Sequence, residues 1–179
     1  MDTIIKMLIL LLIISFMMSG GYVIYMGTKR NQFPKVDFSR FNDDKRNVDG
    51  LETLVNNALN GVNGWMWLAT LFMSVYYFLN FWSIAFLLLD IVIVAYEVPE
   101  YKDVILFLTA GSLMFTFLEL WINSKEKSIH FHNQWFDTSA TAKEYLAKFA
   151  AAEKYDDLCK LVEEFNNKIY NENKNVHFL

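Results

Sequence analysis

The chain has 179 residues, of which 54% are hydrophobic and 17% aromatic, and its formal net charge is −4 at pH 7. The apolar residues are gathered into long blocks, which is typical of an integral membrane protein rather than a soluble globular domain. Acids and bases are interspersed, so no basic field is available for duplex nucleic acid, and the single cysteine, Cys159, excludes an internal disulfide framework.

The first apolar segment runs from Ile4 to Met26. One interpretation is a secretory signal, since a short polar start precedes the apolar run and small residues follow at positions 19–21. We favour a retained crossing, because a segment of this length can span a bilayer while the Lys6 side chain reaches its surface. Residues 1–27 are therefore expected to form an N-terminal transmembrane helix.

Residues 28–61 form a linker that is rich in bases. Apolar residues recur at helical spacing from Leu51 to Val62, which predicts a loop leading into a short amphipathic helix that enters the membrane past Gly61 and Gly64. The bases are candidates for contact with an anionic lipid or a nucleotide, against the alternative of a solvated flank. These candidates are Lys29, Arg30, Lys35, Arg40, Lys45 and Arg46.

Residues 62–122 are expected to form a transmembrane hairpin. The apolar runs 65–97 and 104–121 contain no Lys or Arg and are separated by a charged turn around Pro99. Each run is long enough to cross about 30 Å of hydrocarbon, where lipid offers no partner for backbone polar groups. Because Pro99 ends a helix, the two arms should lie antiparallel.

The first arm of the hairpin is longer than one crossing requires. As a helix, residues 65–97 would extend about 50 Å at a rise of 1.5 Å per residue. The arm must therefore tilt, project beyond the bilayer or break near Asn80 and Ser83. A break would divide residues 62–122 into three short crossings.

The distribution of Lys and Arg predicts the orientation. The bases of the linker, together with Lys125 and Lys127 after the last crossing, place the linker and the C-terminal region in the cytoplasm. The N-terminus and the turn at residues 97–102 should then lie outside. Three crossings in total are preferred, with four as the alternative.

Residues 123–179 are expected to form a cytoplasmic helical tail. Thr141 and Glu144 match a capping box, which predicts a long amphipathic helix from about Thr141 to Tyr170. One helix cannot bury its apolar stripe alone, so the stripe must pack on the linker helix or on neighbouring protomers. The residues that we expect at an oligomer interface are Leu158, Leu161, Val162, Phe165 and Ile169.

The sequence contains no motif that indicates catalysis. It has no Gly-rich phosphate loop, no serine elbow and no spaced Cys/His set for zinc. His130 and His132 lack a third ligand nearby, so surface or capping histidines are favoured over a metal site. We therefore expect neither an enzyme nor a bound metal or cofactor.

Asp90, Asn80 and Glu119 are polar side chains inside the apolar runs. Asp90 lies roughly 10 Å of helical rise before the turn. A carboxylate at that depth is costly and usually faces a bundle interior or a water-filled path. A pore or ion-path role and a hydrogen-bonded packing role both stay open, and a pore would require a homo-oligomer because each chain has few crossings.

A two-crossing hairpin is followed by Lys125-Glu-Lys-Ser-Ile-His130 and then by a long amphipathic helix that ends Lys168-Ile-Tyr-Asn. This pattern, over about Leu51 to Tyr170, resembles the SLATT domains, two-transmembrane effectors of bacterial nucleotide-signalling and antiphage systems. The extra N-terminal crossing and the overlong first arm depart from the simple form. The resemblance implies a pore in the bacterial inner membrane, gated by a nucleotide that a partner nucleotidyltransferase makes.

Two functions from different classes follow from these patterns. The first is an oligomeric pore or ion-channel effector. The alternative is a non-catalytic accessory subunit of a larger membrane complex, such as a respiratory assembly, in which unrelated subunits cover the apolar faces. A channel should purify alone as a defined homo-oligomer, whereas an accessory subunit should not.

Overall fold

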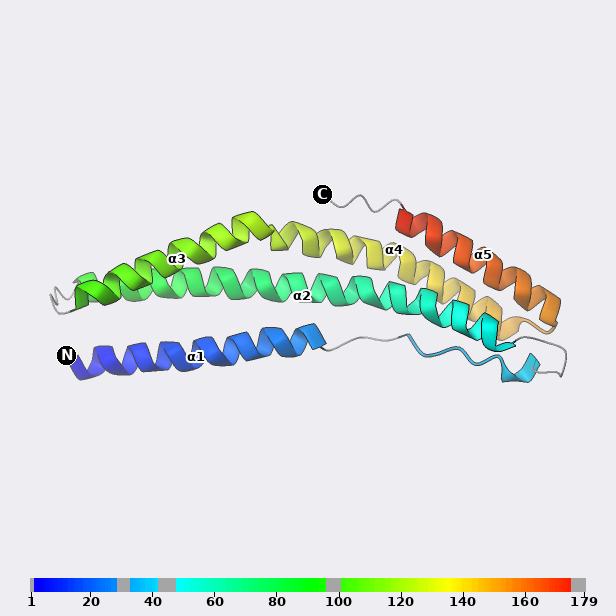
Figure 1. The fold of residues 1–179 in the computed structure, drawn as a ribbon, viewed down its shortest axis with the longest axis horizontal. Coiled ribbons are helices and arrows are strands. Elements are labelled where there is room, and N and C mark those ends of the chain that lie inside the picture. The colour runs from blue at the N-terminus through cyan, green and yellow to red at the C-terminus, as the bar shows by residue number, and fades with distance from the viewer. Residues whose placement is uncertain (1, 29–32, 42–47, 96–100, 175–179) are drawn as a thin grey trace. The chain divides into compact units, whose positions relative to one another are not determined.

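The structure, a computed structural model, describes residues 2–28, 33–41, 48–95 and 101–174 (Figure 1). The described residues contain helices and no strand, so the all-α fold is confirmed. The helices are α1 (Asp2–Thr28), α2 (Val48–Ala95), α3 (Lys102–Ile122), α4 (Ser124–Ala151) and α5 (Tyr155–Lys174), with a 3-10 turn, η1, at Ser39–Phe41.

The described residues divide into two compact units. Unit 1 contains residues 2–28, 70–95 and 101–128, and unit 2 contains residues 33–41, 48–69 and 129–174. Along the chain, one unit gives way to the other after residues 69 and 128. Helix α2 contributes to both units.

Helix α2 is unbroken over 48 residues, which corresponds to about 70 Å at 1.5 Å per residue. Of the three alternatives for the long first arm, the break near Asn80 and Ser83 does not occur, because the helix continues through both residues. Asn80 Nδ2 donates a hydrogen bond of 2.9 Å to the Tyr76 carbonyl within the helix. The expected separate linker helix is also part of α2. Gly61 and Gly64 are accommodated inside it, since one glycine in a helix costs only about 1 kcal/mol relative to alanine.

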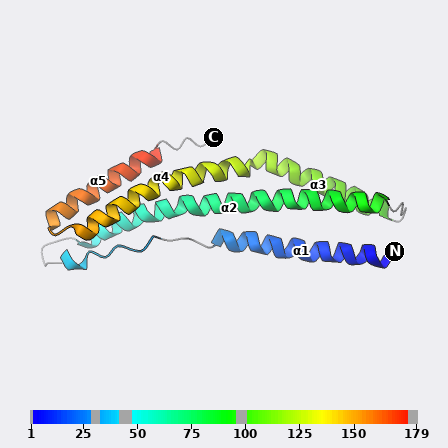
Figure 2. The same cartoon turned by 180° about the vertical axis from the view of Figure 1, so that it is seen from behind.

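Unit 1 is a helical hairpin of α2 and α3, and α1 runs beside α2 in both views (Figures 1 and 2). Trp82 of α2 is fully buried, and its indole nitrogen donates to Ser19 Oγ of α1 at 2.7 Å. The Phe16 ring of α1 meets the Trp82 ring edge-on, with 5.0 Å between ring centroids. Aromatic packing therefore joins α1 to the hairpin.

The outer surface of unit 1 is strongly apolar. The side chains of Leu106, Phe117 and Leu120 on α3 are each more than 70% exposed, and exposed apolar residues continue along α1 and α2. Two helical stretches, Val48–Ala95 and Lys102–Ala151, are long and apolar enough to cross a membrane. The described apolar stretch of α1, Ile9–Val23, is shorter, so an N-terminal crossing stays a prediction.

Unit 2 contains a second helical hairpin, in which α5 folds back along α4 (Figure 2). The expected single helix from Thr141 to Tyr170 is therefore wrong, because the chain leaves the helix after Ala151. Thr141 is not a helix cap either. It lies inside α4, and its hydroxyl donates to Glu172 Oε1 of α5 at 2.7 Å.

The apolar stripe of the tail forms the core of unit 2. Its members pack against Val55, Leu59 and Val62 of α2. The stripe therefore packs on the part of α2 that was expected to be the linker helix, the first of the two alternatives, and the chain's own helices cover its side chains. Four of them are buried and one is partly buried: Leu158, Val162, Phe165, Ile169 and, in part, Leu161.

Residues 33–38, which precede η1, lie along α2 and are hydrogen-bonded to its side chains. Asn63 Oδ1, Asn56 Oδ1 and Glu52 Oε1 of α2 accept hydrogen bonds from the backbone N–H groups of residues 33, 36 and 38. The Phe38 side chain is buried in the core of unit 2. The linker that was expected to be a solvated loop is, in this part, packed structure.

Candidate functional site: a polar seam in the apolar hairpin

Asp90 lies on α2 and faces α3 within unit 1. Thr109 Oγ1 of α3 donates a hydrogen bond of 2.8 Å to Asp90 Oδ2. The other carboxylate oxygen, Oδ1, is buried and has no hydrogen-bond partner among the described residues. The structure thus places this carboxylate between the two arms of the hairpin, with one of its two oxygens left without a described partner.

A second polar cluster lies two helical turns away from Asp90 and also joins α2 to α3. Ser83 Oγ lies 2.8 Å from Thr116 Oγ1 and 3.1 Å from Ser112 Oγ. Ser112 Oγ in turn donates to the Ser83 carbonyl at 2.9 Å. Hydroxyl groups of both helices therefore form one connected network.

We call these two groups together the polar seam, and its residues are Ser83, Asp90, Thr109, Ser112 and Thr116. The seam is interrupted between the two clusters, where the Phe86 ring lies against Gly111. A Cβ atom on Gly111 would be only 2.7 Å from that ring. Glycine therefore allows an aromatic side chain to fill the space between Asp90 and the hydroxyl network.

The sequence analysis identified Asp90 but missed the residues of α3. Thr109, Ser112 and Thr116 are spaced three and four apart, which places them on one face of a helix. Ser83 and Asp90 are seven apart on α2 and share a face in the same way. Each apolar arm thus carries polar side chains on one helical face. This pattern was the signal in the sequence that could have predicted the seam.

Asn80 and Glu119, the other polar candidates, do not join the seam. Asn80 bonds to the backbone of its own helix, as described above. Glu119 accepts a hydrogen bond from the Ser124 hydroxyl at the junction between α3 and α4. Asn123 adopts a left-handed conformation there, with φ of 51°, and its N–H donates to the Glu119 carbonyl at 2.7 Å. Glu119 is thus part of a helix junction.

Of the six basic candidates the structure describes Lys35 and Arg40, and these two do not form an anion site. Lys29, Arg30, Lys45 and Arg46 lie outside the described residues. Arg40 Nη2 donates to the carbonyl oxygens of Phe149, Ala150 and Ala152 at 2.6, 3.1 and 3.0 Å. These oxygens lie at the C-terminal end of α4, where backbone carbonyls lack hydrogen-bond partners within the helix. Arg40 therefore caps a helix.

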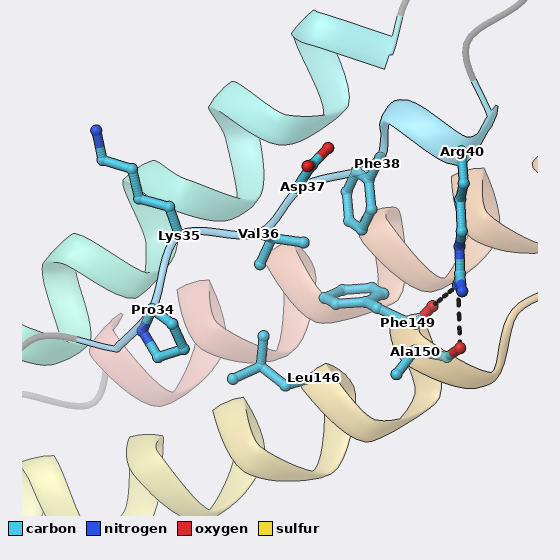
Figure 3. A pocket seen from close by; sticks show the side chains of 9 residues that line it. All are labelled: Pro34, Lys35, Val36, Asp37, Phe38, Arg40, Leu146, Phe149 and Ala150. Atoms are coloured by element: carbon cyan, nitrogen blue, oxygen red, sulfur yellow. Dashed lines mark hydrogen bonds between the residues drawn. The ribbon is translucent and has the colours of Figure 1, made fainter.

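Figure 3 shows the pocket beside this cap, with a volume of about 270 Å³. Val36, Phe38, Leu146 and Phe149 give it an apolar lining. The Lys35 side chain points away from Arg40 in this view, so the two bases do not converge on one ligand. The pocket offers no convergent positive charge for a phosphate group.

The two histidines, His130 and His132, lie in different surroundings. His130 Nε2 is buried without a hydrogen-bond partner among the described residues, while the exposed His132 lies beside the Trp135 ring. Over residues 2–28, 33–41, 48–95 and 101–174, no three His, Cys, Asp or Glu side chains are placed to hold a metal ion. The geometry gives these histidines no shared site.

Helix α4 carries an exposed charged group in unit 2. Glu144 accepts hydrogen bonds from Lys148 Nζ at 2.6 Å and from Lys168 Nζ at 3.4 Å. The hydrogen bond from Lys148, and then that from Lys168, lower the pKa of the Glu144 carboxyl below its ordinary value. This cluster joins α4 to α5 on the protein surface.

The polar seam is thus the candidate functional site, because it combines a carboxylate and four hydroxyls inside the most apolar part of the chain. Comparison of the chain with protein-family models, curated proteins and solved structures finds no match.

Proposed function

We propose that the chain is a cation-conducting protein of the bacterial inner membrane, that it works as a homo-oligomer, and that cations follow the polar seam. The observation that carries this proposal is Asp90, a carboxylate inside an apolar hairpin with one buried oxygen left without a partner. An ionisable group within a membrane segment is costly and usually marks an ion or proton path.

The exposed surface of unit 1 supports placement in lipid. A single soluble chain rarely exposes a large contiguous apolar surface, because burial of such surface is strongly favourable. Lys125 Nζ lies 5.8 Å from the Tyr76 ring and Lys127 Nζ lies 5.7 Å from the Phe72 ring. Bases and aromatic rings gather where a membrane helix reaches the headgroups, on the cytoplasmic side for Lys.

In this proposal unit 2 is the cytoplasmic part that receives the signal. It has a conventional buried core and carries charged side chains on its surface. The resemblance to the SLATT domains supplies the nature of the signal, a nucleotide made by a partner nucleotidyltransferase, and the role in antiphage defence. No described side-chain cluster supports the nucleotide, so this step rests on the resemblance alone.

The experiment is bilayer recording from the purified full chain. Asp90→Asn keeps the size of the side chain and removes its charge, so we expect cation conductance to fall at least tenfold while the oligomer stays intact. Asp103→Asn is the matched control, since Asp103 is an exposed acid in the first turn of α3. That variant should conduct like the unmodified chain.

Two outcomes would contradict the proposal. A chain that purifies without forming a homo-oligomer and that passes no current in the presence or absence of nucleotides would favour the accessory-subunit function. A current that is the same in the unmodified and the Asp90→Asn chains would remove Asp90 from the conduction path.

A further inference from the structure

We infer that the ion conducted by the polar seam is the proton, and that Asp90 Oδ1 is the atom that takes it up. The inference rests on the proposed function and narrows it to one ion. Three features of the described residues support it: the number of oxygen ligands, the absence of a counter-charge, and the chemistry of the hydroxyl network.

Within one chain, few oxygens of the described residues meet at Asp90. The site offers two carboxylate oxygens and the Thr109 hydroxyl, whose proton already points at Oδ2. Ca²⁺ takes six to eight oxygen ligands, and Mg²⁺ requires an octahedral set. Channels that pass K⁺ replace its hydration shell with rings of carbonyls. A proton needs only one acceptor atom, and Oδ1 is such an atom.

Among the residues that the structure describes, no Lys or Arg side chain forms an ion pair with Asp90. Within residues 65–95 of α2 the only charged residue is Asp90, and within residues 104–122 of α3 the only one is Glu119, which Ser124 binds at the far end. Lys6 of α1, near the start of that helix, and Lys102 and Asp103, in the first turn of α3, are exposed.

The proton step balances at this one atom. The uptake step forms one O–H bond at Oδ1 and turns the carboxylate into a neutral carboxyl group. The release step breaks that bond and restores the carboxylate, and neither step transfers an electron to or from the protein.

The hydroxyl network provides the next part of the path. Each hydroxyl both donates and accepts hydrogen bonds, so a chain of them can accept a proton on one side while releasing another on the other side. Ser83, Ser112 and Thr116 form such a chain. The Phe86 ring against Gly111 separates it from Asp90, so transfer requires this ring to move and admit water.

The experiment uses the full chain reconstituted in vesicles of phosphatidylethanolamine and phosphatidylglycerol that are loaded with KCl. In the first arm valinomycin sets a K⁺ diffusion potential, and an internal dye reports proton uptake. In the second arm a protonophore carries protons, and a K⁺-sensitive dye reports K⁺ release through the protein. We expect proton uptake in the first arm and no protein-dependent K⁺ release in the second.

Variants connect the flux to the proposed atom. Asp90→Asn should reduce proton uptake at least tenfold, whereas Asp103→Asn should leave it unchanged. Infrared difference spectra between acid and neutral pH give a readout that does not depend on flux. The unmodified chain should show a carboxylic-acid C=O band that is missing in Asp90→Asn.

The outcomes separate this inference from the proposed function. K⁺ release through the protein at a rate similar to proton uptake would overturn the proton assignment and leave a cation pore in place. No protein-dependent flux in either arm, in the presence or absence of nucleotides, would overturn both. An infrared band that persists in Asp90→Asn would overturn the assignment of the proton to Asp90.

Discussion

Asp90 depends on one hydroxyl from the neighbouring helix for its only described hydrogen bond. Thr109→Val has nearly the same shape but no hydroxyl, so Asp90 Oδ2 would lose its donor. Leaving a buried polar group without a partner costs about 1–3 kcal/mol. We therefore expect the midpoint of thermal unfolding in detergent to fall for Thr109→Val and to be retained for Thr109→Ser, whereas equal loss in both variants would show that the hydroxyl has no role.

Glu144 links α4 to α5 through Lys148 and Lys168, and this predicts a pH dependence. The pKa of Glu144 is lowered in the folded chain, so its contribution to stability is present above the unfolded pKa and is lost as the pH falls through the folded pKa. Glu144→Gln should lower the unfolding midpoint at neutral pH and low salt. The difference should shrink in acid and in high salt, since the group is exposed and screened.

The control for Glu144→Gln is Glu153→Gln, another exposed acid of unit 2. This variant should leave the unfolding midpoint nearly unchanged at either salt concentration. A destabilisation by Glu144→Gln that is as large at high salt as at low salt would contradict an electrostatic role.

At the scale of elements, the contact between α2 and α3 depends on Gly111. Gly111→Ala would gain up to about 1 kcal/mol of helix propensity. The added Cβ would meet the Phe86 ring, and such overpacking costs about 1–3 kcal/mol. We expect net destabilisation, whereas Gly61→Ala, with nothing within 4 Å of its Cβ, should be neutral or stabilising. Equal effects of the two substitutions on the unfolding midpoint would contradict close packing at Gly111.

Helix α5 provides the test of how unit 2 holds together. Phe165 is fully buried in its core, whereas Tyr170 is 65% exposed. Phe165→Ala should lower the free energy of unfolding by about 3–5 kcal/mol, because it removes buried apolar surface and leaves a cavity. Tyr170→Ala should have a small effect. Dissociation of an otherwise stable oligomer by Phe165→Ala would show that the residue contributes to an interface after all.

Local pattern predicted the elements of the hairpin better than those of the tail. The arms of α2 and α3 follow from their apolar runs, but the end of α4 at Ala151 carries no Gly or Pro stop signal nearby. Arg40, more than a hundred residues earlier, stabilises the end of α4 by binding its last carbonyls. A tertiary contact of this kind cannot be found from the sequence around the helix end.

The same reason explains the errors at Thr141 and Asn80. The Thr141 hydroxyl fits a capping motif in sequence, but in the fold it donates to Glu172 of another helix. Asn80 was a candidate position for a helix break, but its side chain donates a hydrogen bond to the preceding turn and the helix continues. Polar residues in helices have several hydrogen-bonding options, and the fold selects among them.

At the scale of the whole molecule, the account predicts that the start of α3 and the junction of α4 with α5 lie on opposite sides of the membrane. The test is labelling of Asp103→Cys and Glu153→Cys, each in a Cys159→Ser background, by an impermeant thiol reagent in intact cells. Position 103 should react from outside, and position 153 only after the membrane is opened. Labelling of both positions from the same side would contradict the topology.

The sequence predicted the two apolar helices of the hairpin because long apolar runs depend only on composition and length. It could not predict that α2 continues from unit 1 into unit 2, and it left open whether the tail stripe packs on the linker helix or on neighbouring protomers, since both depend on contacts between distant segments. The polar seam was predictable only in part. The spacing of its polar residues along each helix is visible in the sequence, but the pairing of these residues between α2 and α3 is seen only in the fold.

If cations pass along the polar seam, water and ions reach its side chains, and cysteine accessibility measures this directly. In a Cys159→Ser background of the reconstituted full chain, Ser83→Cys and Thr116→Cys place thiols in the seam. Leu113→Cys and Phe117→Cys place thiols on the exposed apolar face of α3. The account predicts that a small charged thiol reagent modifies positions 83 and 116 at least tenfold faster than positions 113 and 117. Equal or no reaction at all four positions would show that the seam is a dry helix contact, and would contradict conduction along it.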